Sequence, residues 1–73
     1  MPSDPEVAWL IEATTDRGPI WFGVRPSGQF GWHSDASSAT RFSRKVDAES
    51  LIEPLSQIFQ RLSLFATEHS WEA

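Results

Sequence analysis

Residues 39–62, with the sequence ATRFSRKVDAESLIEPLSQIFQRL, contain the pattern that decides the fold. The apolar residues in the second part of this stretch recur at steps of three and four, which places them on one stripe of a 3.6-residue helix. The stripe consists of Ala48, Leu51, Ile52, Leu55, Ile58, Phe59 and Leu62. The sequence therefore predicts an amphipathic helix over residues 48–61 that must bury this stripe against another surface.

The start of this helix is predicted at Asp47, because a carboxylate at the N-cap can accept hydrogen bonds from the first free N–H groups. Val46 and Leu51 would then flank the cap as a hydrophobic staple. Pro54 lies inside the span and removes the hydrogen bond to the carbonyl of Ser50. Because the apolar phase continues across Pro54, we expect one kinked helix rather than two helices with Pro54 opening the second.

Alternating apolar and polar residues predict strands on both sides of the helix. The expected strands cover residues 7–15, 20–25, 29–33 and 63–71. Gly18 and Gly28 lie in the two short turns that join the first three, and glycine readily adopts the positive φ that such turns need. The predicted fold class is α+β: an antiparallel three-stranded meander plus a C-terminal strand beside the first, with one helix packed on one face.

The segment between the third strand and the helix is small and polar. We expect residues 34–38 to form a loop or one helical turn capped by Asp35. Ala39 and Phe42 follow at a spacing that could anchor this segment to the sheet. Gly23, inside the second strand, predicts either a bulge or a place where an indole lies over bare backbone.

Length and composition predict a single small domain. The chain has 73 residues, no cysteine and a net charge of −4, and its four Trp and five Phe supply much of the area that so short a chain can bury. Residues 1–6 are expected to be a flexible tail and residues 7–73 the α+β domain. No apolar run is long enough to span a bilayer and no leader pattern precedes the first strand, so we expect a soluble cytoplasmic protein.

Few residues could carry chemistry. No phosphate-binding glycine loop occurs, and no cysteine can serve as a nucleophile or ligand. The only polar set that could bind a metal is His33, Asp35, Glu68 and His69, and the simpler interpretation places both histidines at the rim of the sheet. We therefore predict no catalytic residue, no cofactor and no metal, which means a protein that is not an enzyme.

Two surfaces are candidates for binding. Trp21, Arg25 and Trp32 are predicted to form an exposed aromatic patch on the sheet face that the helix leaves uncovered, because tryptophan is enriched at binding hot spots. The alternative is that the tryptophans only fill the core, with Trp9 and Trp71 as neighbours on paired strands.

The second candidate surface is basic. Arg41, Arg44 and Lys45 flank Phe42, and a surface that combines basic and aromatic side chains can contact single-stranded nucleic acid. The simpler interpretation is a solvated loop, since the acidic residues that follow in the helix offset the positive field.

The order of these motifs resembles that of small phage- and prophage-encoded proteins of unknown function. The matching residues are Trp9, Trp32, Ala39-Thr40-Arg41-Phe42, Ala48 and Glu68-His69-Ser70-Trp71, whereas Pro54 departs from the Ala-rich helix of those proteins. The resemblance implies a fold and a phage origin, and no activity. We expect a non-enzymatic protein–protein interaction module that binds a host or phage protein, as a monomer or homodimer, with nucleic-acid binding through the basic cluster as the alternative.

Overall fold

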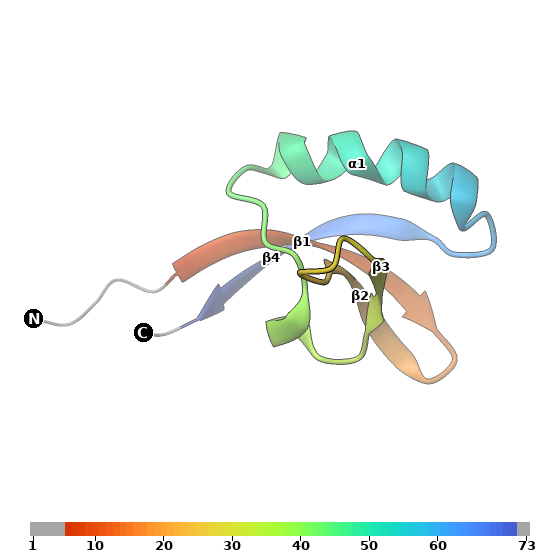
Figure 1. The fold of residues 1–73 in the computed structure, drawn as a ribbon, viewed down its shortest axis with the longest axis horizontal. Coiled ribbons are helices and arrows are strands. Elements are labelled where there is room, and N and C mark those ends of the chain that lie inside the picture. Colours follow the sequence, from red (N-terminus) through yellow and green to blue (C-terminus); the bar gives the residue numbers. More distant parts are fainter. Residues whose placement is uncertain (1–5, 72–73) are drawn as a thin grey trace, which may run out of the picture.

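A computed structural model describes residues 6–71 as an α+β fold with one α-helix on a four-stranded antiparallel sheet of strand order β3-β2-β1-β4. The elements are β1 (Glu6–Thr15), β2 (Gly18–Val24), β3 (Phe30–His33), the 3₁₀ turn η1 (Ala36–Ser38), α1 (Lys45–Ile58) and β4 (Leu64–Trp71). Figure 1 shows α1 on one side of the sheet and η1 on the other. The predicted α+β class, with one helix and an antiparallel sheet, is confirmed. Of the predicted tail, Glu6 begins β1, and residues 1–5 lie outside the described residues.

The helix begins three residues before its predicted start, and Asp47 is not its N-cap. The N-cap is Arg44, which makes no side-chain capping hydrogen bond. The Asp47 carboxylate instead accepts two hydrogen bonds of 3.0 Å from the Arg44 guanidinium, and this contact raises the pKa of Arg44. Val46 is therefore a helical residue, 56 % exposed, so the predicted staple does not form.

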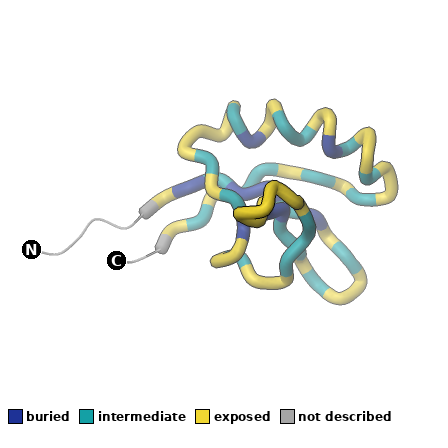
Figure 2. The backbone as a smooth tube through the Cα atoms, viewed as in Figure 1, coloured by how far each residue is buried: buried dark blue, intermediate teal, exposed yellow. Residues whose placement is uncertain are grey.

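The predicted apolar stripe forms the core. Ala48 and Leu55 are buried against Ile11 of β1 and Phe22 of β2. Figure 2 shows buried positions along the side of α1 that faces the sheet. The stripe is interrupted only near its end: Ile58, the last residue of α1, is 61 % exposed.

Pro54 lies inside one continuous helix, as the unbroken apolar phase predicted. Its side chain is exposed, so the ring displaces no core residue. We expect Pro54→Ala to raise the free energy of unfolding by about 1–3 kcal/mol, because alanine restores an N–H donor for the Ser50 carbonyl. Urea denaturation would measure this change, with the exposed Gln57→Ala as a control that stays within about 0.5 kcal/mol. A destabilised Pro54→Ala variant would contradict this role of Pro54 in the helix.

The turns and the sheet register follow local signals. Gly18 and Gly28 both have positive φ, at 109° and 89°. β4 lies antiparallel beside β1 with Ile11 opposite Ala66, which confirms the predicted place of the last strand. Trp9 and Trp71 are not the neighbours on one sheet face that the sequence predicted, because Trp9 lies opposite Glu68 and Trp71 lies opposite Glu6.

The segment after β3 inserts where β1 and β2 diverge. The Asp35 carboxylate accepts a hydrogen bond from the Ser37 N–H, so the predicted cap of one helical turn is confirmed. The Thr40 N–H then donates to the Phe22 carbonyl (3.0 Å), and the Phe42 N–H to the Trp9 carbonyl (2.9 Å). The expected anchoring of this segment is thereby observed as backbone pairing to two strands.

The sheet has two distinct faces because side chains alternate along each strand. The helix face carries Ile11 and Phe22, and the far face carries Leu10 and Gly23. Leu10 is nevertheless fully buried. The prediction that the sheet face opposite the helix is uncovered is therefore wrong, since η1 and its connections lie on that side (Figure 1).

Candidate protein-contact surface

α1 does not cover the whole helix face of the sheet. It packs on β1 and β4, so β2 and β3 extend beyond it. The register places Phe22 opposite Trp32 and Val24 opposite Phe30, and all four side chains therefore lie on the helix face. The uncovered part of this face is consequently aromatic.

The chain just beyond the helix completes this region. The Phe59 ring lies 5.4 Å from the Trp32 ring and 6.3 Å from the Phe30 ring, both edge to face. Buried Phe22 contacts Phe30 and Trp32 from below, at 5.8 and 6.0 Å. Aromatic contacts of this kind contribute about 0.5–1.5 kcal/mol each beyond the area that they bury. The rings thus form a pre-organised cluster rather than a loose set of exposed side chains.

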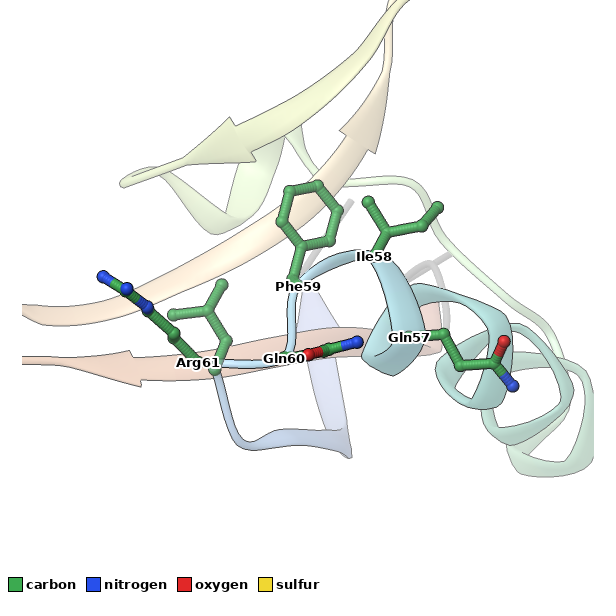
Figure 3. Close-up of a pocket in the computed structure, with 6 residues that line it drawn as sticks. Gln57, Ile58, Phe59, Gln60 and Arg61 are labelled. Atoms are coloured by element: carbon green, nitrogen blue, oxygen red, sulfur yellow. The ribbon is translucent and has the colours of Figure 1, made fainter.

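We call Val24, Phe30, Trp32, Ile58 and Phe59 the aromatic surface. Val24, Phe30 and Ile58 are 50 %, 51 % and 61 % exposed. A contiguous exposed apolar area on a small domain is typical of a contact site. Figure 3 shows Ile58 and Phe59 pointing to the same side and Gln57 pointing away.

One polar atom within the aromatic surface lacks a partner. The Nε1–H of Trp32 is buried and makes no hydrogen bond within the part of the chain that the structure describes. Leaving a buried donor unpaired costs about 1–3 kcal/mol. The large area that an indole buries offsets this cost.

Two hollows border the aromatic surface. One lies at the end of α1 and is lined by Gln57, Ile58, Phe59, Gln60, Arg61 and Leu62 (Figure 3). The other lies along β3 and is lined by Arg25 together with residues 28–33. Each hollow therefore places one arginine beside exposed apolar side chains, in a protein whose net charge is −4.

The structure separates the three residues predicted as one patch. Trp32 lies on the helix face, because the register places it opposite Phe22, so its predicted position on the uncovered face is wrong. Trp21 lies on the far face, where its Nε1–H donates to the Glu12 carboxylate at 2.9 Å. Arg25 follows β2 and is exposed.

A polar network surrounds Trp21 on the far face. Glu12 Oε1 lies 3.4 Å from the Thr67 hydroxyl and 3.9 Å from His69 Nε2, and the same Nε2 lies 2.9 Å from the Thr67 hydroxyl. The His69 ring packs edge to face with Trp21 at 5.9 Å. Because Thr67 and Glu12 both approach the same imidazole nitrogen, His69 is not oriented as a triad base, which needs its second nitrogen held by the carboxylate. The network satisfies polar groups across three strands.

The predicted basic cluster is partly engaged within the chain. Arg44 pairs with Asp47, and Lys45 Nζ lies 5.4 Å from the centre of the Trp9 ring, a cation–π contact. Arg41 is exposed in the connection to α1. At least two of the three cations thus have partners that a phosphate would have to displace.

The structure brings no metal site together. Among residues 6–71, no group of three or more histidine and acidic side chains could hold an ion. His33 contacts the backbone region of Gly23, whereas His69 belongs to the network around Glu12. In the same described range, no helix has the length and apolar character to cross a membrane.

Sequence reasoning missed the contributions of Phe30, Ile58 and Phe59 to the surface. The helical period assigned Ile58 and Phe59 to the buried stripe, but α1 ends at Ile58 and Phe59 is its C-cap. No glycine or proline marks this end, so the sequence carries no strong stop signal there. The signal for Phe30 was available in the turn, because a turn with Gly28 in positive φ fixes which residues lie opposite each other.

No family model, curated protein or solved structure matches this chain. The resemblance to phage and prophage proteins therefore stays a prediction, and the function of the chain has to be argued from its geometry.

Proposed function

We propose that this protein is a non-enzymatic interaction module that binds another protein through the aromatic surface. The observation that carries the proposal is the exposure of Phe30 and Ile58. The Phe30 ring also packs against the rings of Phe22 and Phe59. A rigid aromatic contact loses little conformational entropy when a partner binds. This surface replaces the patch of Trp21, Arg25 and Trp32 expected from the sequence.

The charges around the aromatic surface favour an apolar partner that also carries acidic groups. Arg25 and Arg61 line the two bordering hollows, and both side chains are exposed. Rim charges of this kind direct orientation and the rate of association more than they add affinity. If the predicted origin holds, the partner is a protein of the phage or of its host, and cytoplasmic location is part of the same proposal.

Affinity capture from a lysate of the source cells, quantified by mass spectrometry, tests the surface. We expect Phe30→Ser to lower recovery of a specific partner at least about tenfold, the size of effect typical of a central contact residue. Val46→Ser is the matched control, because Val46 is 56 % exposed on α1 outside the surface. Trp21→Ala reports on the far face, where the sequence predicted the contact.

Equal recovery by wild type and Phe30→Ser, with loss in Trp21→Ala, would overturn the proposed surface in favour of the far face. Circular dichroism of each variant must first show an unchanged fold. Binding of an oligonucleotide that weakens with salt and with loss of Arg41 would instead support the nucleic-acid alternative.

A further inference from the structure

The backbone of β3 presents hydrogen-bonding groups away from the sheet. The Arg25 N–H donates to the Gln29 carbonyl at 2.7 Å, which makes these two residues a hydrogen-bonded pair at the start of the β2–β3 ladder. Such pairs alternate along an antiparallel ladder. Gly23 and Gly31 therefore bond to each other, whereas the N–H and C=O groups of Phe30 and Trp32 point outward.

Hydrogen bonds on the opposite edge of β2 independently support this alternation of inward and outward backbone groups. The Phe22 carbonyl accepts from the Thr40 N–H, and the Val24 N–H donates to the Thr40 hydroxyl. Both residues thus direct their backbone groups away from β3. Their cross-strand neighbours Trp32 and Phe30 must likewise turn their backbone groups away from β2.

Nothing in the described part of the chain pairs with this edge. β3 is the outer strand of the sheet, and a hollow lined by Arg25 and residues 28–33 runs along it. The residues with outward backbone groups are the two whose side chains belong to the aromatic surface. An unpaired edge beside exposed apolar side chains is the arrangement used in recognition by strand addition.

We infer that an extended segment of a partner protein adds to the sheet as a fifth strand beside β3. Alternate apolar side chains of this segment would lie on the aromatic surface, and an acidic side chain would lie near Arg25. The inference rests on the proposed function and specifies how the surface is used.

A segment of a different protein fits this edge better than a second copy of this chain. Each copy carries a net charge of −4, so two copies repel at low salt. A short peptide that carries a single acidic residue beside Arg25 brings less negative charge to this edge than a second copy does.

Selection from a display library of linear peptides of roughly 12 residues tests the inference while the natural partner is still unidentified. Enriched peptides should alternate apolar residues and carry an acidic group. N-methylation of single peptide amides, measured by calorimetry, should then weaken binding at every second position, by about tenfold where a backbone hydrogen bond is lost.

Two variants at Phe30 separate its side chain from its backbone. Phe30→Ala removes only the ring contact, whereas Phe30→Pro removes the ring and the outward N–H; the β2–β3 ladder keeps its hydrogen bonds in both. We expect Phe30→Pro to bind about tenfold more weakly than Phe30→Ala. Val46→Ser is the control, since Val46 is 56 % exposed on α1 and lines neither the aromatic surface nor the hollow along β3.

The possible failures are distinguishable. Equal binding by the two Phe30 variants, together with indifference to N-methylation, would overturn strand addition while leaving the aromatic contact in place. Loss of binding in Trp21→Ala, with unchanged binding in Phe30→Ala and Phe30→Pro, would overturn both and favour the far face. If light scattering showed a concentration-dependent doubling of mass that Phe30→Pro abolishes, a second copy would occupy the edge and strand addition by a partner would be overturned. If the library yielded no enriched peptide and Phe30→Ser did not change capture of a partner, the proposed function itself would be overturned.

Discussion

Replacing Leu10 with alanine is expected to lower the free energy of unfolding by about 2–5 kcal/mol, as for a residue in the main core. Leu10 and Ile11 are adjacent, point to opposite faces of β1, and are both fully buried. A single covered face would leave one of them in contact with solvent. Urea denaturation of Leu10→Ala and Ile11→Ala, followed by circular dichroism, should therefore give losses of similar size.

An exposed aliphatic residue supplies the control for this comparison. Val46→Ala should change the free energy of unfolding by no more than about 0.5 kcal/mol, because Val46 is 56 % exposed on α1. If Leu10→Ala behaved like Val46→Ala, the far face would be open and the cover formed by η1 and its connections would contribute no packing. A small domain has only a few kcal/mol to lose, so unfolding of Leu10→Ala without denaturant would agree with the prediction.

The features that could be predicted are those set by neighbours in the sequence. The spacing of Ala48 and Leu55 identified the buried side of α1, and Gly18 and Gly28 identified the two turns, because helix phase and turn geometry are local properties. Asp47 shows the limit of such reasoning. It has the chemistry of an N-cap, yet its carboxylate pairs with Arg44 one turn earlier, and the sequence alone does not decide between these two partners.

The features that could not be predicted depend on segments distant in the sequence. Alternation placed Leu10 on a mixed face that the helix leaves uncovered, yet Leu10 is fully buried, and residues 40–42 bond to β2 and β1 beside it. Trp32 illustrates a different limit for the site. Side chains alternate with a period of two, so its face depends on the register of β3 with β2, and this register follows from the geometry of the turn that holds Gly28.

The aromatic surface was therefore predictable in kind and not in position. Surplus aromatic residues in a short chain indicated an exposed patch, and the structure does expose Phe30. Its location depends on how far α1 reaches across the sheet, which is set by the end of the helix at Ile58. No glycine or proline near Ile58 predicts the end of α1 from the sequence.

The packing of η1 against the far face of the sheet requires a glycine at position 23. A Cβ atom added at Gly23 would lie 2.8 Å from the Ser38 carbonyl oxygen and 2.8 Å from the His33 ring, closer than atoms can approach. The expected bulge or overlying indole is therefore wrong, and the glycine instead admits the end of η1 and an imidazole. Because Ser38 contributes a backbone atom, the clash cannot be relieved by rotating a side chain.

Gly23→Ala should accordingly lower the free energy of unfolding by about 1–3 kcal/mol, the usual cost of overpacking, or more if η1 is displaced. Gly31 is the matched control, because it lies directly opposite Gly23 on β3 and a Cβ there meets nothing within 4 Å. Gly31→Ala should be neutral or stabilise the protein by up to about 1 kcal/mol, since alanine restricts the unfolded chain. Thermal and urea denaturation of the two variants side by side measure the difference in their free energies of unfolding. If Gly23→Ala were as stable as Gly31→Ala, the segment from η1 to Thr40 would not lie against β2. The burial of Leu10 would then need another explanation.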